Sequence, residues 1–379
     1  MKKKILFAVE SLAGGGAEKI LTTIVRNLDH EKYEITVLTV VESGFFLEDI
    51  KKYSRIISML PDYNLLSDGF SKLRYKLNYR RIYSKDIKTV YAKFIKEIYD
   101  VEIAFIEGFA TKLIAASPNQ SSKKYAWVHT DMICNPHADR VYASMDEQKQ
   151  AYRTYHNIFT VSKQVSDAFK NKFGNEYTVE VQYNPVDSKE INKMAKQACD
   201  YQYNLSPRLI TCGRLEKEKG YDRLLEAIRD LVRDQQCELE LWILGKGSER
   251  KELEKYIIDN KLETYVKVLG FQSNPYCFMK RADIFVCSSR AEGFSTVATE
   301  ALILDTPVIT TECAGMRDLF GESNCGMIVP NTKEGIRDAL EAIIRKPELI
   351  QKYKIGAQNR AKDFSIEKRM REIEDLLDA

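Results

Sequence analysis

The chain has 379 residues, too many for one small hydrophobic core, and this length predicts two domains. Hydrophobic residues at 44% and charged residues at 30% are typical of a folded globular protein and exclude disordered and collagen-like chains. The net charge of +3 gives no overall attraction to nucleic acid, and the longest apolar runs are strand-sized, short of the roughly 20 residues that span a membrane.

Short β-branched apolar runs alternate with helix-period segments along the chain, a pattern typical of the α/β class with parallel sheets. The first series of predicted strands is 4–9, 33–41, 101–105, 124–128 and 158–161, with helices at 17–28 and 163–173. The second series is 208–212, 239–244, 266–269, 284–287, 307–310 and 327–329, with helices at 221–232 and 296–304. The sequence therefore predicts two doubly wound domains.

The boundary between the domains is expected within 183–206, where Asn184-Pro185 ends a strand and a polar run follows. We expect an N-terminal domain over 1–183, a linker over 184–206 and a second domain over 207–363. Ligands of open parallel sheets bind beyond the carboxyl ends of the strands. Two such domains facing one another would form a deep cleft, and chemistry is expected in the loops that follow the strands.

The cellular compartment is indicated by the N-terminus and the cysteines. The apolar run after Lys2-Lys3-Lys4 breaks at Glu10 with no cleavage site, so export is not expected. The eight cysteines form no CxxC pair, and we expect reduced thiols without disulfides or zinc. The prediction is a cytoplasmic protein, associated if at all with the inner face of the membrane.

A glycine turn, Gly14-Gly15-Gly16, follows the first predicted strand and leads into a helix. Free N–H groups at such a helix start can hold an anion. A dinucleotide fingerprint needs a further glycine three positions on, where this chain has Lys19, which counts against a nicotinamide enzyme. The alternative is a turn that needs glycine only for its shape.

Fixed cations follow the first strand of the second domain, at Arg214 and Lys219. Arg214 offers a planar fork to phosphate oxygens and Lys219 offers a compact charge, a combination suited to a diphosphate leaving group. The alternative is a solvated loop in which Glu216 and Glu218 neutralise the lysines.

Two carboxylates, Glu292 and Glu300, lie on either side of a predicted turn into a helix. Gly293 permits the turn, and Ser295 or Thr296 is expected to cap the helix. The helix start offers N–H groups and a positive dipole end to phosphate, while the carboxylates can accept hydrogen bonds from sugar and ribose hydroxyls. In the alternative interpretation Glu300 is a surface residue and Glu292 a turn residue.

These motifs together resemble glycosyltransferase family 4, of the bacterial capsular or exopolysaccharide type. They occur in the order and spacing of that family over nearly the whole chain: Gly14-Gly15-Gly16-Ala17-Glu18, Gly213-Arg214-Leu215 with Lys219-Gly220, Leu244-Gly245-Lys246-Gly247, Glu292-Gly293-Phe294-Ser295 with Glu300-Ala301, and Pro307-Val308-Ile309. Asp305-Thr306 before Pro307 and Asp318 depart from the family pattern, so the identity of the sugar is not predicted.

The resemblance implies the GT-B fold, two Rossmann-like domains, and transfer from a nucleotide sugar with retention of anomeric configuration. It also implies that residues 364–379 form a helix crossing back to the first domain. By the same resemblance Arg214 and Lys219 bind the diphosphate, Glu292 contacts the donor sugar and Glu300 holds the ribose. The residues expected at the nucleotide sugar are Gly15, Gly16, Arg214, Lys219, Gly293, Phe294, Ser295, Thr296 and Glu300.

His129 and Asp131 follow a predicted strand of the first domain, where either side chain is placed to act as a general base. The resemblance instead implies that His129 lines the donor-sugar site. We expect catalysis to depend on Glu292, His129, Arg214 and Lys219. No Asp-x-Asp motif or His/Cys cluster has metal-ligand spacing, so we expect no cofactor and no metal.

Residues 70–94 combine cations with aromatic and aliphatic side chains, and at helical spacing Tyr75, Tyr79, Ile82 and Tyr83 share a face. Such a segment suits an anionic membrane surface beside a lipid-linked acceptor. The alternative is a solvated helix that packs its tyrosines on the first domain. No nucleic-acid-binding module is recognisable.

The resulting hypothesis is a retaining glycosyltransferase that moves a hexose or N-acetylhexosamine, from a UDP-sugar or related donor, to a lipid-linked glycan in surface polysaccharide or glycoconjugate biosynthesis. Three alternatives remain open: a non-catalytic GT-B partner subunit, a GT-B sugar-nucleotide epimerase, and an inverting transferase.

Overall fold

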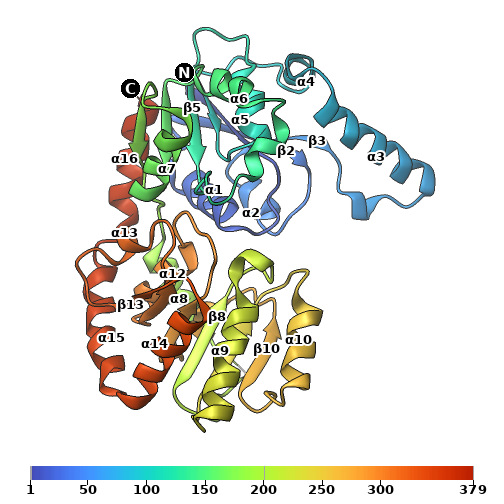
Figure 1. The fold of residues 1–379 in the computed structure, drawn as a ribbon. Coiled ribbons are helices and arrows are strands. Elements are labelled where there is room, and N and C mark those ends of the chain that lie inside the picture. The colour runs from blue at the N-terminus through green and yellow to red at the C-terminus, as the bar shows by residue number, and fades with distance from the viewer. Residues whose placement is uncertain (1, 200, 379) are drawn as a thin grey trace. The chain divides into compact units, whose positions relative to one another are not determined.

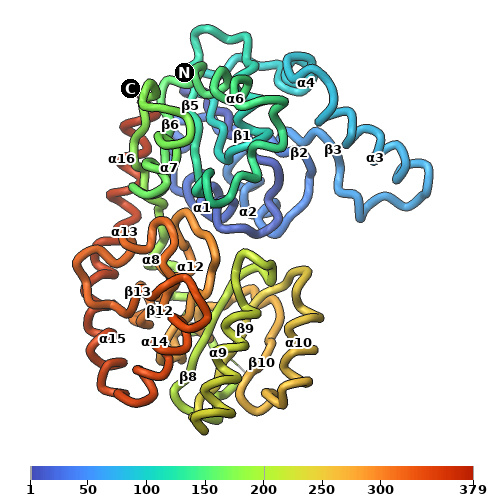
Figure 2. Tube along the Cα trace, in the orientation of Figure 1, coloured from blue at the N-terminus to red at the C-terminus, as the bar shows by residue number. Residues whose placement is uncertain are grey.

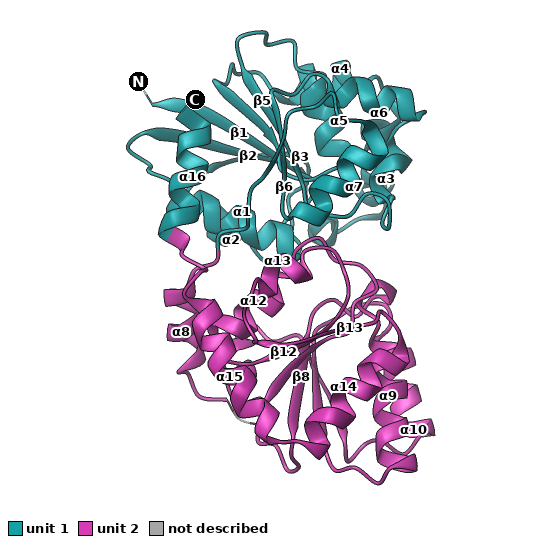
Figure 3. Cartoon of the chain, turned by 60° about the vertical axis from the view of Figure 1, so that its left-hand side comes forward, with its two compact units in different colours: residues 1–185, 367–379 teal, residues 186–366 magenta. Residues whose placement is uncertain are grey.

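The computed structural model describes residues 2–199 and 201–378 (Figure 1). The chain divides into two compact units, unit 1 (Met1–Pro185 and Glu367–Ala379) and unit 2 (Val186–Ile366), coloured separately in Figure 3. Each unit carries one wholly parallel sheet covered by helices, so the predicted α/β class with two Rossmann-like domains is confirmed.

Unit 1 contains a seven-stranded sheet with the order β3-β2-β1-β4-β5-β6-β7. Its strands are β1 (Lys3–Val9), β2 (Tyr33–Val41), β3 (Arg55–Leu60), β4 (Val101–Ala104), β5 (Lys123–Val128), β6 (Asn157–Thr160) and β7 (Val179–Val181). Its helices are α1 (Gly16–Asn27), α2 (Leu47–Ile50), α3 (Gly69–Ser84), α4 (Ile87–Phe94), α5 (Phe109–Ala115), α6 (Met145–Tyr152) and α7 (Lys163–Phe173), and α16 (Ile366–Asp378) joins them from residue 367 on. Strands β3 and β7 were not predicted.

Helix α16 is held on unit 1 by contacts near the chain's end. The Tyr33 hydroxyl donates to Asp378 at 2.9 Å, and the Tyr125 hydroxyl donates to the backbone carbonyl of Leu376 at 3.2 Å. Residues at both ends of the unit 1 sequence therefore fold as one body, as the path of the tube in Figure 2 also shows.

Unit 2 contains a six-stranded sheet with the order β10-β9-β8-β11-β12-β13. Its strands are β8 (Arg208–Cys212), β9 (Glu240–Leu244), β10 (Val266–Gly270), β11 (Ile284–Cys287), β12 (Val308–Thr311) and β13 (Gly326–Val329). Its helices are α8 (Ser188–Ala195), α9 (Tyr221–Asp234), α10 (Arg250–Asp259), α11 (Tyr276–Met279), α12 (Thr296–Ile303), α13 (Met316–Phe320), α14 (Lys333–Arg345) and α15 (Glu348–Ala361).

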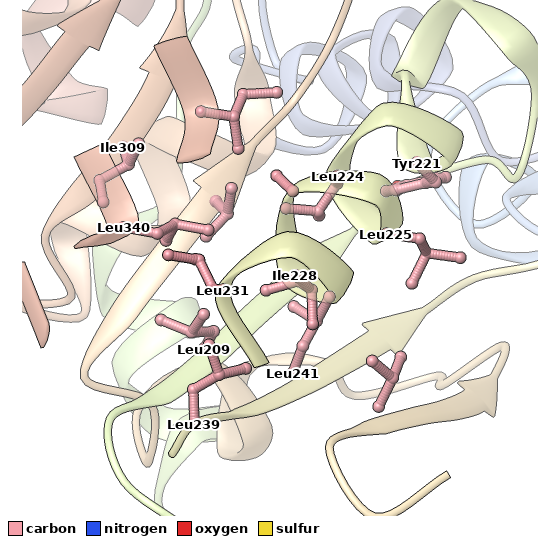
Figure 4. Packing of buried hydrophobic residues seen from close by; sticks show 14 of the residues in the cluster. Leu209, Tyr221, Leu224, Leu225, Ile228, Leu231, Leu239, Leu241, Ile309 and Leu340 are labelled. Atoms are coloured by element: carbon pink, nitrogen blue, oxygen red, sulfur yellow. The ribbon is translucent and has the colours of Figure 1, made fainter. Parts of the chain in front are cut away.

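Helix α9 shows how this sheet is covered. Leu224, Ile228 and Leu231 recur at helical spacing, are fully buried, and point at Leu209 and Leu241 of the sheet (Figure 4). Truncating one such leucine to alanine costs about 2–5 kcal/mol, so this face fixes the position of the helix. The loop before α9 carries two of the predicted site residues and is positioned with it.

The predicted linker over 184–206 is corrected by the structure. Unit 1 extends to Pro185, and the residues that follow belong to unit 2. They include α8, which buries Ile191 and packs against α11 and α12. A hydrogen bond of 2.9 Å from the Asn274 amide to the backbone carbonyl of Met194 fixes the end of α8. The polar composition of this stretch reflects the exposed face of an amphipathic helix.

The segment predicted to contact a membrane forms two helices, α3 and α4, separated at Asp86, whose carboxylate caps the Thr89 amide at 3.0 Å. In Figure 1 α3 extends away from the sheet of its own unit. Among the described residues, no helix combines the length and apolar character that crossing a bilayer requires.

Candidate active site

The predicted donor residues lie at the carboxyl ends of β8 and β11, which are neighbours in the unit 2 sheet. The strand order reverses between these two strands, because the chain proceeds outward to β9 and β10 on one side and to β12 and β13 on the other. Open parallel sheets bind ligands beyond this reversal point. Topology alone therefore makes this edge the candidate site of unit 2.

The centre of the site is an ion pair between Lys219 and Glu292. The Lys219 Nζ lies 2.7 Å from Glu292 Oε1, and the two side chains are 23% and 12% exposed. Burial acts to lower the pKa of Lys219, but the charge of Glu292 and its hydrogen bond outweigh it and raise that pKa. Lys219 is therefore a fixed cation at neutral pH.

Two serines that follow β11 hold the residues of this pair, one within its own loop and the other across to the loop after β8. The Ser289 hydroxyl donates to Glu292 Oε1 at 2.6 Å, and the Ser288 hydroxyl donates to the backbone carbonyl of Lys219 at 2.8 Å. Gly220 has φ +65°, and a Cβ there would lie 2.2 Å from the carbonyl oxygen of Ser288, so only glycine allows this approach.

Arg223 and Asn331 support the loop after β11, and sequence reasoning missed both. The Arg223 guanidinium donates to the carbonyls of Ser288 and Ser289, each at 2.8 Å, and to the carbonyl of Asn331 at 2.9 Å. The Asn331 amide donates to the carbonyl of Arg290 at 3.0 Å. Arg223 and Asn331 lie far in the sequence from the carbonyls that they bind, so no local sequence pattern predicts these contacts.

Arg214 does not take part in the Lys219–Glu292 ion pair, although it is near enough for its charge to act on Lys219. Its side chain is 61% exposed and bonds Glu218 at 3.0 Å, one helical turn further along the chain. Exposed pairs of this kind contribute about 0–1 kcal/mol, so Arg214 can exchange Glu218 for a phosphate at little cost. Glu216 is turned away and accepts from the backbone N–H and the hydroxyl of Ser248 at 3.0 and 2.7 Å. The alternative of a neutralised, solvated loop therefore does not describe Lys219.

The start of α12 contains the remaining predicted donor residues. The Ser295 side chain accepts from the Ala298 amide, so Ser295 caps the helix and Thr296 is its first residue. Phe294, Ser295 and Thr296 are buried. Glu300 is only 1% exposed, which excludes its interpretation as a surface residue. Within unit 2 the structure thus places Glu292, Gly293 and Glu300 around one helix start.

The other predicted residues belong to unit 1. Gly15 caps α1 with ordinary extended backbone and Gly16 is its first residue, whereas Gly14 has φ +121° and is the one position in the turn that requires glycine. The glycine turn is therefore located at a helix start, as the sequence predicts.

His129 follows β5, and its ring lies 5.0 Å from the ring of Phe105. Burial lowers the pKa of His129 to about 4, so the ring is neutral at pH 7. The ring donates to the backbone carbonyl of Phe105, and Nε2 has no partner among the described residues, which makes Nδ1 the donor and Nε2 an acceptor. A neutral ring can accept from a hydroxyl but supplies no positive charge to a phosphate. Asp131 instead accepts from the amides of Ile133 and Cys134 at 2.9 and 3.0 Å.

Two glutamates that the sequence analysis did not single out accompany His129 in unit 1. Glu107 follows β4 and accepts from the His129 amide at 3.0 Å and from the Thr130 hydroxyl. Glu10 follows β1 and accepts from the Tyr83 hydroxyl at 3.1 Å. Burial raises the pKa of both carboxyls. The sequence signal that could have identified both glutamates is their position in the loops that follow apolar strands.

No group of three or more His, Cys, Asp or Glu side chains suited to a metal ion occurs in the part of the chain that the structure describes. The positive charge at the unit 2 site comes from Lys219, Arg214 and the start of α12.

Comparison with known proteins identifies the class of protein. Residues 203–360 match the family model described as Glycosyl transferases group 1. A protein of Campylobacter jejuni, named N-acetylgalactosamine-N,N'-diacetylbacillosaminyl-diphospho-undecaprenol 4-alpha-N-acetylgalactosaminyltransferase, is 27% identical over 378 residues, which cover 96% of each chain. The lipopolysaccharide core biosynthesis glycosyltransferase LpsE of Rhizobium meliloti is 31% identical over 140 residues, 37% of this chain and 40% of LpsE.

The solved structure of HepE from Anabaena, in complex with UDP and glucose, matches all of both chains with a TM-score of 0.75 and 20% identity. The chain is a GT-B glycosyltransferase. The predicted fold and class of enzyme are thereby confirmed, while family 4 membership and retention stay predictions.

The first prediction concerns Lys219 of the glycosyltransferase. Lys219→Ala is expected to lower kcat about a hundredfold or more, because a preorganised charge beside the leaving group is lost. Lys333→Ala is a matched control, since Lys333 is 27% exposed and lies 3.1 Å from Asp230, which is 13% exposed. Steady-state kinetics and thermal unfolding of both variants check this, and equal turnover in the two variants would contradict it.

The second prediction concerns the protonation of His129. The unfolded pKa is about 6.5 and the folded value about 4, so the unfolded state binds more protons between these values. His129 therefore destabilises the fold as pH falls from 6.5 towards 4, by an amount on the order of 2 kcal/mol at pH 4.5. Urea unfolding at pH 7 and 4.5 should show a smaller loss in His129→Gln than in wild type. Identical losses would mean that His129 is not held neutral.

Proposed function

We propose that the chain transfers a hexose or N-acetylhexosamine from UDP to a lipid-linked glycan, with retention of anomeric configuration, in surface polysaccharide or glycoconjugate biosynthesis. Unit 2 binds the nucleotide sugar and unit 1 the acceptor. The observation that supports the proposal is the Lys219–Glu292 pair, a cation suited to a diphosphate lying 2.7 Å from a carboxylate suited to sugar hydroxyls. The names of two similar proteins support it, one naming a diphospho-undecaprenol-linked substrate and one a complex with UDP and glucose.

Charge development explains how the site would accelerate transfer. As the bond from the sugar to the diphosphate breaks, negative charge grows on the leaving phosphate oxygen. Lys219 and the N–H groups at the start of α12 are fixed before the reaction, and Arg214 joins them once it exchanges Glu218 for a phosphate, so their attraction grows with that charge and lowers the barrier. Glu292 keeps lone pairs beyond those used by Lys219 and Ser289, and these accept from sugar hydroxyls. In this proposal transfer needs no metal ion.

The direct test is incubation of the purified chain with UDP-sugars and undecaprenyl-diphosphate-linked glycans. UDP release that requires the acceptor, with an α-linked product by NMR from an α-linked donor, is the expected result. A non-catalytic subunit would release no UDP, and an inverting enzyme would give the β-linked product.

The third prediction separates the roles of Glu300 and Lys219 in nucleotide binding. Glu300→Gln is expected to weaken uridine, UMP and UDP alike, about tenfold, because a charge-assisted hydrogen bond to the ribose is lost. Lys219→Ala is expected to weaken UDP but not uridine. Calorimetry with the three ligands measures both effects.

The control for Glu300 is Glu240→Gln. Glu240 is equally buried at 1% exposure, but it opens β9 and bonds the Trp242 indole N–H at 2.6 Å. Its substitution should lower stability and leave the dissociation constants within about twofold. Equal weakening in both variants would remove the ribose role of Glu300.

Helix α3 is the proposed contact with the cytoplasmic face of the membrane. Residues 70–94 contain eight Lys and Arg and one Asp, so this segment is more positive than the whole chain at +3, and the remainder is net negative. None of the cations at 72, 74, 76, 80, 81, 85 and 88 makes an ion pair with another described residue. Clustered, unpaired cations are what an anionic leaflet attracts.

The apolar face of α3 differs from the predicted one. Ile82 is buried at 6% exposure and Tyr83 bonds Glu10, so this end of the predicted face turns toward the rest of unit 1, while Tyr79 stays 41% exposed. Phe70, Leu73 and Leu77 are instead 75%, 58% and 46% exposed, at helical spacing. We assign the lipid-facing stripe to these three residues.

The fourth prediction tests the electrostatic part of this contact. Arg80→Ser with Arg81→Ser is expected to weaken binding to anionic vesicles about thirtyfold, from about 1 kcal/mol for each cation. Lys51→Ser with Lys52→Ser removes the same charge from unit 1, where Glu48 and Asp49 already pair with these lysines at 3.0 and 3.1 Å. Cosedimentation at fixed salt measures both, and equal binding to neutral and anionic vesicles would contradict the proposal.

A further inference from the structure

The base of α3 is joined to the carboxyl end of β1 by one hydrogen bond. The Tyr83 hydroxyl, in the last turn of α3, donates to Glu10 Oε2 at 3.1 Å. Among the described residues, no other α3 side chain hydrogen-bonds outside its own helix and cap. The direction of α3 therefore depends on Glu10 more than on any other polar contact.

Glu10 connects three elements at once. Besides Tyr83, its carboxylate accepts from the backbone N–H of Phe109 in α5, and the Tyr83 and Phe109 rings lie 4.7 Å apart. Burial and the charge of Glu10 raise the pKa of Tyr83, so the phenol keeps its proton and donates. A hydrogen bond to a partly buried carboxylate is stronger than a neutral one, which makes this junction directional.

Helix α3 is anchored at the Tyr83 end and weakly restrained at the other end. Ile82 is its only buried residue, so little apolar packing restrains its far end. The rings of Tyr63, Tyr75, Tyr79 and Tyr83 follow one another along it with centroids 5.2, 6.3 and 5.1 Å apart. Phe70 lies thirteen residues before Tyr83, about 20 Å along the helix axis. A small change at Glu10 therefore moves the exposed stripe by several ångströms.

We propose that Glu10 is a positioning residue that acts through Tyr83 to set the direction of α3 from the strand edge of unit 1. This inference rests on the proposed function, in which the lipid end of the acceptor meets α3 and its sugar end meets the strand edge. Glu10 then determines, through Tyr83, how the lipid end of a membrane-bound acceptor is positioned relative to its sugar end.

Tyr83→Phe tests the inference, because it removes the hydroxyl and keeps the ring on Phe109. We expect the KM for a vesicle-bound, lipid-linked acceptor to rise about tenfold, while the KM for the same glycan on a short soluble chain stays within about twofold. Glu10→Gln, which leaves one acceptor oxygen for two donors, should shift the KM in the same direction.

Tyr91→Phe is the matched control. Its hydroxyl donates to Glu102 Oε2 at 3.0 Å, a buried tyrosine–glutamate bond between α4 and β4 of the same unit that does not involve α3. Both KM values should stay within about twofold of wild type. Amide hydrogen exchange, which needs no activity, should quicken in 69–84 for Tyr83→Phe and not for Tyr91→Phe.

Unchanged exchange and unchanged lipid-acceptor KM in Tyr83→Phe would overturn the positioning role. An equal rise in KM for both acceptors would also overturn it, because Glu10 would then act at the acceptor site and not through α3. A wild-type chain that releases no UDP with any acceptor would refute the proposed function, while faster exchange confined to Tyr83→Phe would still support the junction.

Discussion

The structure of the proposed donor site depends on the ion pair between Lys219 and Glu292, which joins loops that follow different strands. A largely buried pair is favourable only when both members keep good partners, since losing one leaves an uncompensated charge. A sugar diphosphate offers an anion to Lys219 and hydroxyls to Glu292. Such a donor can separate the pair without leaving either group unsatisfied, whereas a simple phosphate satisfies only the lysine.

Much of the fold was predictable because most of its strands are apolar runs between clear turns. Most residues of β1, β2 and β8 are buried, and the bounds of these strands agree with prediction to within a residue. β7 was missed because it has only three residues, none of them buried, and β3 because its first four residues are exposed or only partly buried. The helix at 188–195 was taken for a linker because its single buried residue, Ile191, leaves a largely polar segment.

The site was predictable only where its residues stand in motifs. Lys219, Glu292 and the cap at Ser295 follow strands within recognisable patterns, and the structure places them at one sheet edge. Arg223 was not predictable, because its role depends on carbonyls 65 and 66 residues away. From the sequence, an arginine in an amphipathic helix is expected to be exposed to solvent. The carbonyls that Arg223 binds come close to it only in the folded chain.

The net charge of +3 does not show that charges of opposite sign are concentrated on different surfaces of unit 1. The strand edge of unit 1 carries Glu10 and Glu107, and burial, together with a smaller contribution from the charge of Glu10, raises the pKa of Glu107. These two carboxyl groups offer no positive charge to an anionic ligand. The cations are instead concentrated on α3, beyond Tyr83. An acceptor with neutral sugars and an anionic lipid end suits this division, because each part then meets the surface that favours it. The hydrogen bond from Tyr83 to Glu10 joins the strand edge of unit 1 to the cationic helix α3. It therefore sets the position of one surface relative to the other.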